Sequence, residues 1–389
     1  MDYFAAATIF AKLANANTPV TAVAPIPYWE NLFPLAAGPA SANLFGCKFP
    51  GESSATTLTA TQAMYDLFAC NVGNETSALF FADLPQSFGN PAAGGCFPAC
   101  ATVNGVTQPN QFFDGQWSSL YAWRTIGNSA YHSAQFMIRH RRTYGLEFDF
   151  NYTLSKSTDV GSNAERINEF EGFGLGSQII NTWQPNALHA VSDFDTTHQI
   201  NSNWVYELPF GRGKQFGGGM NSAADAVLGG WQLAGLFRWT SGFPFTIGPG
   251  LGFWGTNWQL TSEGILTGKV PKTGRFVDKD GDPNVFQNGP NASNAFRIAF
   301  PGESGQRNNL RGPGFLNTDM SLTKQWKITE SQNLKFSWEV FNLFNNVRFD
   351  VATMAATNGS FAANASQFGK FTKTLSTPRL MEFMLRYSF

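Results

Sequence analysis

Hydrophobic and polar residues alternate along several stretches in the C-terminal two thirds of the chain. Between residues 146 and 155 one set is apolar (Leu, Phe, Phe, Tyr, Leu) and the other is polar (Glu, Asp, Asn, Thr, Ser). Successive side chains of a β-strand point to opposite faces, so this stretch predicts a strand with one apolar and one polar face. A tilted strand needs about ten residues to cross a bilayer, which this stretch supplies.

The same alternation recurs and predicts seven strands. They cover residues 129–140, 145–157, 196–209, 229–247, 314–327, 332–345 and 378–389. The predicted connections hold about 4, 38, 19, 66, 4 and 32 residues, so short ones alternate with long ones. Bacterial outer-membrane barrels have short periplasmic turns and long extracellular loops. The pattern therefore favours an all-β fold, part of an antiparallel transmembrane outer-membrane β-barrel, over a soluble β-sandwich.

In such a barrel the two sets of side chains would meet different surroundings. The residues predicted to face lipid are Phe148, Phe150, Phe336, Trp338, Phe383 and Leu385. The residues predicted to face the lumen are Glu147, Asp149, Asn151, Asn317, Asp319, Lys335, Glu339 and Arg386. A register slip of one residue would exchange the two sets.

Composition supports the barrel and excludes other classes. Charged residues make up only 14% of the chain and aromatic residues 15%. A soluble protein with so few charges and so many aromatic residues would tend to associate through its surface. No run of 18 apolar residues occurs, so a transmembrane helix is not expected. A net charge of -1 argues against nucleic acid as a partner.

The first 128 residues show no comparable alternation, and we expect an extracellular loop region there, followed by barrel strands in residues 129–389. All four cysteines, Cys47, Cys70, Cys96 and Cys100, lie in this first region. Their number and clustering indicate disulfides, with free thiols as the alternative. Four cysteines permit three pairings, and Cys47 with Cys70 and Cys96 with Cys100 would close the shortest loops.

Other candidate chemistry is weak. Asp278, Asp280 and Asp282 alternate around a glycine as in a calcium loop, but no closing Glu follows, so a polar turn is the preferred interpretation. No G-x-S-x-G, H-E-x-x-H or Ser/His/Asp arrangement is present, which argues against an enzyme such as a barrel lipase. No cofactor is expected. The terminal Tyr387 and Phe389 resemble the signal that the barrel-assembly machinery reads on a last strand.

Four groups of residues carry a resemblance to a known family. They are Gly127–Gln135; Asn151–Ser157; Ser192–Asp195 with Tyr206–Lys214, Gly229–Gln232 and Ser241–Thr246; and Arg307–Phe315 with Glu339–Asn346. In this order and spacing they resemble the barrel of TonB-dependent receptors of the Oar-like type. Full-length members of that type begin with a carboxypeptidase-regulatory-like domain.

The resemblance implies a barrel of about 22 strands, closed by a plug domain, that imports a scarce solute with energy passed on by TonB. Seven strands would form only its C-terminal part, and TonB would act through N-terminal parts that this sequence lacks. No secretory signal begins the chain, so we expect Met1 to be an internal start and the chain alone not to transport. Outer-membrane lipid would surround it. The alternative function is a surface or adhesive barrel protein without transport.

Overall fold

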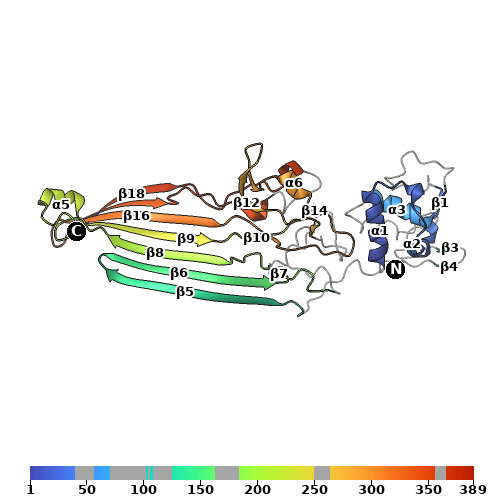
Figure 1. Ribbon diagram of the computed structural model, residues 1–389, viewed down its shortest axis with the longest axis horizontal. Coiled ribbons are helices and arrows are strands. Elements are labelled where there is room, and N and C mark those ends of the chain that lie inside the picture. Colours follow the sequence, from blue (N-terminus) through green and yellow to red (C-terminus); the bar gives the residue numbers. More distant parts are fainter. Residues whose placement is uncertain are drawn as a thin grey trace.

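The computed structural model describes residues 1–39, 57–70, 102–103, 106–107, 125–162, 184–248, 263–354 and 365–389. Its main sheet is antiparallel, with the strand order β18-β17-β16-β9-β8-β6-β5 (Figure 1). The strands are β5 (Ser129–Thr143), β6 (Leu146–Asp159), β8 (His198–Glu207), β9 (Trp231–Thr240), β16 (Phe315–Lys327), β17 (Asn333–Phe341) and β18 (Leu380–Ser388). An eighth, β7 (Ala190–Val191), pairs with the end of β6. All seven predicted strands are confirmed.

The sheet is not closed. Strands β5 and β18 lie at the two ends of the strand order, and neither has a second neighbour among the described strands. Every residue of β18 is exposed, as are all but one of β5. The two edges therefore present unpaired backbone groups and large apolar side chains such as Phe136 and Phe383.

The register divides the side chains of the sheet into an apolar face and a polar face. All six residues predicted to face lipid share the apolar face; Trp338, for example, lies opposite Phe383, with their rings stacked at 6.1 Å. All eight residues predicted to face the lumen share the polar face, where Lys335 lies opposite Arg386. Which face meets lipid stays a prediction.

The short connections gather at one end of the sheet, which we call the turn end. Tyr144 and Gly145 join β5 to β6 with φ values of 53° and 82°, the left-handed pair that a tight hairpin requires. A Cβ on Gly145 would lie 2.9 Å from the carbonyl oxygen of Glu207, so only glycine fits this turn without strain. The long connections gather at the opposite end, the loop end (Figure 1).

At the loop end, segments predicted as long loops pack around a core of their own, together with residues 241–247, which were predicted as the end of a strand but lie beyond β9. The core contains Phe245, Val285, Phe286, Met354 and Phe368. The elements around it are short: β10 (Pro244–Phe245), β11 (Ile265–Leu266), β12 (Thr273–Val277), β13 (Pro283–Phe286), α6 (Gly289–Ser293), β14 (Phe296–Arg297), β15 (Leu310–Arg311), η5 (Val351–Thr353) and η6 (Ala365–Gln367).

The expectation of a loop region in residues 1–128 missed three helices. These are α1 (Tyr3–Asn15), α2 (Pro27–Leu32) and α3 (Ala60–Cys70), joined by η1 (Val20–Ala22) and η2 (Pro34–Ala36). The short strands β1 (Gly38–Pro39), β2 (Thr57–Leu58), β3 (Thr102–Val103) and β4 (Val106–Thr107) also lie in this region. The boundary at residue 128 and its extracellular position stay predictions.

The three helices pack around buried aromatic side chains. Phe10 stacks on Trp29 at 4.9 Å, and Tyr65 and Phe68 complete the cluster. The face of α1 that enters this cluster is mostly alanine, which produces little hydrophobic periodicity, and the helix was therefore not predicted. Within the parts of the chain that the structure describes, no helix has the length and apolarity to span a membrane.

The short helix α5 (Ser222–Leu228) is attached to the apolar face at the turn end. Lys324, which lies opposite Trp231 on that face, donates from Nζ to the carbonyl oxygens of Asp225, at 3.2 Å, and of Gly229. The indole N–H of Trp326 donates to the carbonyl oxygen of Ala226 at 2.7 Å, and that of Trp231 donates to the carbonyl oxygen of Val227 at 2.8 Å. The last carbonyls of a helix lack partners within it, so these three side chains complete the end of α5.

We expect Lys324→Met to destabilise the protein. It removes the ammonium group that the carbonyl oxygen of Gly229 accepts, while the carbonyl oxygen of Asp225 keeps the backbone N–H of Gly229, and we expect a loss of about 1–3 kcal/mol of unfolding free energy. Urea unfolding in lipid vesicles measures the difference. Lys327→Met, on an exposed residue of the same strand, is the matched control and should change little. Equal effects of the two substitutions would contradict the attachment of α5 through Lys324.

Candidate functional site

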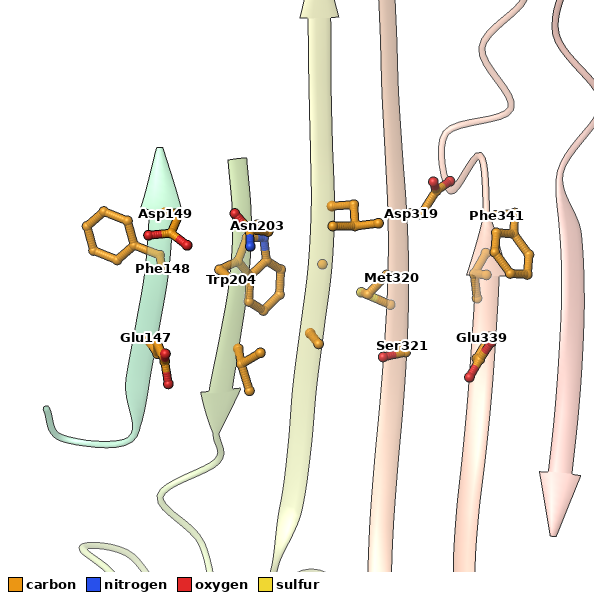
Figure 2. A pocket seen from close by; sticks show the side chains of 15 residues that line it. Glu147, Phe148, Asp149, Asn203, Trp204, Asp319, Met320, Ser321, Glu339 and Phe341 are labelled. Carbon is orange, nitrogen blue, oxygen red and sulfur yellow. The ribbon is translucent and has the colours of Figure 1, made fainter. Parts of the chain in front are cut away.

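The polar face carries a depression of about 400 Å³ across its central strands. Figure 2 shows the side chains around it, which come from β6, β8, β9, β16 and β17. Four carboxylates belong to this lining: Glu147, Asp149, Asp319 and Glu339. All four were predicted to face the lumen, and the structure brings them to one area of the sheet.

The register explains why a depression forms here. One row across the sheet reads Glu147, Val205, Ala234, Ser321 and Glu339, with each residue opposite the next. The middle side chains are small and the outer ones are long. Ala234 and Ser321 therefore form a low floor between two carboxylates.

Gly235, the neighbour of Ala234 in the chain, belongs to the opposite, apolar face. A Cβ there would lie 2.6 Å from the indole ring of Trp204, the residue across from it on β8. Glycine in a strand interior often marks a close approach of this kind. The ring of Trp204 thus covers the apolar side of the sheet directly behind the depression.

The carboxylates differ in how they are held. Asp149 forms an ion pair with Arg139 at 2.7 Å, at the exposed edge of the sheet. Asp319 accepts from the backbone N–H of Asn342 at 2.8 Å and from the side-chain amide of Asn317 at 3.0 Å. Together with the amides of the next row, Asn201 and Asn317, the face offers an array of hydrogen-bonding groups rich in acceptors, suited to contact a polar solute or water.

A second polar cluster, which we call the loop-end junction, consists of Asp159, Asp193, Asp195, Arg307 and Arg311. Arg307 pairs with both Asp159 and Asp193 at 2.7 Å, and Arg311 pairs with Asp195 at 2.7 Å. The guanidinium of Arg307 is almost fully buried, with 7% of its side chain exposed. The junction ties the segment before β16 to the connection between β6 and β8.

The carboxylates around Arg307 stabilise the charged form of its guanidinium group. Burial alone would lower the pKa of Arg307, but the negative charges of Asp193 and Asp159 raise it overall. Asn308, in a left-handed conformation at φ 51°, adds hydrogen bonds to the carbonyl oxygen of Val191 at 2.7 Å and to Asp193 at 2.6 Å. The arrangement is a brace of ion pairs and hydrogen bonds between the loops and the rim of the sheet.

The ion pairs of this junction were not predicted. Ser192–Asp195 and Arg307–Phe315 belong to stretches that resemble the receptor family, and they lie more than 100 residues apart. Two acids spaced by two residues and two arginines spaced by four were a signal of mutual contact. Only the fold shows which acid each arginine takes.

The aspartates that resemble a calcium loop surround a lysine. Nζ of Lys370 lies 3.2 Å from Asp278, 3.4 Å from Asp280 and 2.9 Å from Asp282. Oδ1 of Asp278 also accepts the backbone N–H groups of Asp280 and Asp282, each at 2.9 Å, as in a polar turn. No group of three His, Cys, Asp or Glu residues suited to a metal ion occurs in the described ranges.

Two further predictions stay open. Cys47, Cys96 and Cys100 lie outside the described residues, and Cys70 ends α3, so the disulfide pairing is untested. Tyr387 lies on the apolar face opposite Leu334, and its ring is 5.8 Å from that of Phe389. Phe389 is 93% exposed at the turn end, and its role as an assembly signal stays a prediction.

Comparison with known protein families matches residues 70–382 to the outer membrane beta barrel domain. This chain belongs to that family. The protein is therefore an outer-membrane β-barrel protein of bacteria, and its sheet is a barrel wall that is not closed. No curated protein and no solved structure is similar enough to this barrel protein to count as a match.

Substitution of Arg307 tests the loop-end junction of the barrel protein. Arg307→Met leaves Asp159 and Asp193 without their shared partner, and breaking a buried ion pair costs about 3–5 kcal/mol. Urea unfolding should show a loss approaching that range. Arg275→Met, on an exposed residue of β12, is the matched control. A loss no larger than that of the control would show that the junction contributes little to stability.

Glu263, in the same loop region, makes the stability of the folded protein depend on pH. Burial raises the pKa of its carboxyl group to about 7, with Asp193 adding to the shift and Arg307 opposing it. The folded state therefore binds more protons than the unfolded state between the ordinary pKa and about 7. Stability from this group is present at low pH and is lost as pH rises through about 7.

We expect Glu263→Gln to raise the melting temperature at pH 8 and to change it little at pH 5. Glu303→Gln should instead lower the melting temperature by a similar amount at both pH values, because hydrogen bonds from Arg297 lower the pKa of Glu303 and keep its carboxyl group ionised at pH 5 and at pH 8. Thermal unfolding of both variants at the two pH values provides the comparison. The same shift at both pH values for Glu263→Gln would contradict the raised pKa.

Proposed function

We propose that this sheet is part of the wall of a TonB-dependent receptor, an outer-membrane transporter that imports a scarce solute. The resemblance to the Oar-like type supports the proposal, and two of the stretches that carry it, Ser192–Asp195 and Arg307–Phe315, supply four of the five residues of the loop-end junction. That junction supplies a structural reason for both stretches, since Arg307 and Arg311 hold the long loops to the sheet rim. Membership of the outer membrane beta barrel family does not by itself identify a TonB-dependent receptor.

The observation that carries the proposal is a polar face on a sheet with two open edges. Unpaired strand edges cost several kcal/mol per group in lipid, so β5 and β18 need further strands beside them. The lumen of a barrel widens with the number of its strands, and barrels of about 22 strands are those that hold a plug. In this proposal Glu147, Asp149, Asp319 and Glu339 line the solute path, with TonB and the plug acting from other parts of the assembly.

A second candidate function is a surface or adhesive barrel protein without transport. The packed structure at the loop end favours it, because both the helical cluster around Trp29 and the core around Phe286 lie there (Figure 1). Loops with their own cores can present a fixed surface to another cell or matrix. This function needs neither TonB nor a polar solute path.

Uptake measurements in the bacterium separate the two functions. The test compares a strain lacking this coding region, a strain lacking TonB, and a strain lacking both, with labelled metal chelates, oligosaccharides and peptides as solutes. Transport predicts that uptake of one class falls equally in all three strains. Unchanged uptake together with impaired surface attachment would refute transport and favour adhesion.

Variants of the polar face refine the test. Asp149→Asn combined with Glu339→Gln removes two negative charges from the depression. The double variant should reduce uptake of the same solute, because two carboxylates that would accept hydrogen bonds from the solute become amides. Glu330→Gln, in the exposed turn between β16 and β17, is the matched control and should leave uptake unchanged. Equal uptake by the double variant and the control would remove these carboxylates from the path.

A further inference from the structure

Helix α5 exposes apolar side chains where it rests on the apolar face of the sheet. Val227 is 65% exposed and Leu228 is 56% exposed. Asn221 caps the first turn of the helix, and Oδ1 of Asp225 accepts the backbone N–H of Arg212 at 2.7 Å, whereas Ser222 is exposed. The exposed surface of α5 is therefore apolar at its C-terminal end.

The position of α5 is fixed by residues of the apolar face itself. Lys324, Trp231 and Trp326 all belong to that face, and all three donate to carbonyls at the end of α5. The same face continues from Trp231 to Phe336, whose rings meet edge to face at 6.1 Å. The exposed surface of α5 is thus continuous with the face predicted to meet acyl chains.

The level of α5 along the barrel is also defined. It lies at the turn end, beside the C-terminus (Figure 1). Short turns of outer-membrane barrels lie on the periplasmic side, and Trp side chains gather where the hydrocarbon meets the headgroups. Trp231 and Trp326, both bonded to α5, mark that level.

We propose that α5 is an interfacial foot that inserts Val227 and Leu228 into the periplasmic leaflet, with phospholipid as its partner. Short apolar surfaces on helices lie in this way at the boundary between headgroups and acyl chains. The proposal requires that the apolar face meets lipid. It is independent of TonB and of transport.

Lys324 gives the foot a second role. It is a cation on the apolar face, opposite Trp231 and Phe336, and only 3% of the residue is exposed. Its ammonium group lies 5.5 Å from the ring centroid of Trp231 and 5.4 Å from that of Trp326, under the carbonyls of α5. The helix therefore covers a charge that would otherwise face lipid, while its own outer surface supplies the apolar contact.

Photocrosslinking in intact outer membranes tests the proposal. A benzophenone amino acid is placed at Val227, at Leu385 on the apolar face, and at Val277, a 72% exposed residue of β12 at the loop end. We expect phospholipid adducts at Val227 and Leu385 and none at Val277. Mass spectrometry of the irradiated, purified chain identifies each adduct.

The outcomes distinguish this proposal from the assignments around it. Lipid adducts at Leu385 but only protein adducts, or none, at Val227 would overturn the foot and leave the face assignment in place. The absence of lipid adducts at both positions would overturn the foot and the face assignment together. Neither outcome depends on solute uptake, so a failure of the transport proposal is read separately.

Discussion

A backbone inside lipid finds no water to bond with, so each of its N–H and C=O groups must find a partner in the protein. This constraint governs the arrangement of the main sheet. The inner strand β9 pairs with β16 over residues 231–240 and with β8 over residues 232–240, and its neighbour β16 pairs with β9 over residues 315–324 and with β17 over residues 320–327. By the same constraint, the outer edges of β5 and β18, which have no second neighbour among the described strands, require further strands beside them in lipid.

Where pairing is local and periodic, the sequence was sufficient to predict the fold. The alternation in residues 146–155 defines β6 and its two faces without knowledge of any partner strand, and one residue of slip would have exchanged them. The polar depression follows from the same pattern, because Glu147 and Glu339 were assigned to one face. The floor between them was not predictable, since it depends on which small side chains of β9 and β16 come opposite one another.

Where contacts are distant in sequence, prediction failed. Arg307 reaches Asp159 across 148 positions, and no local pattern selects that partner. The cores around Trp29 and Phe286 are assembled from short elements whose hydrophobic residues lack a sustained period. Lys324 is instructive because it breaks the apolar pattern of its strand; the exception is explained only by α5, which the sequence placed inside a turn.

If this chain is a sector of a transmembrane wall, one face of the sheet must meet lipid and the other must meet water. A nitroxide scan along residues 333–340 of β17 in native-like bilayers, with the other cysteines replaced by serine, tests it most directly. The account predicts a period of two: accessibility to oxygen at positions 336 and 338, and accessibility to a water-soluble relaxation agent at positions 335 and 339. The opposite phase, or equal access of the water-soluble agent to both sets of positions, would contradict it.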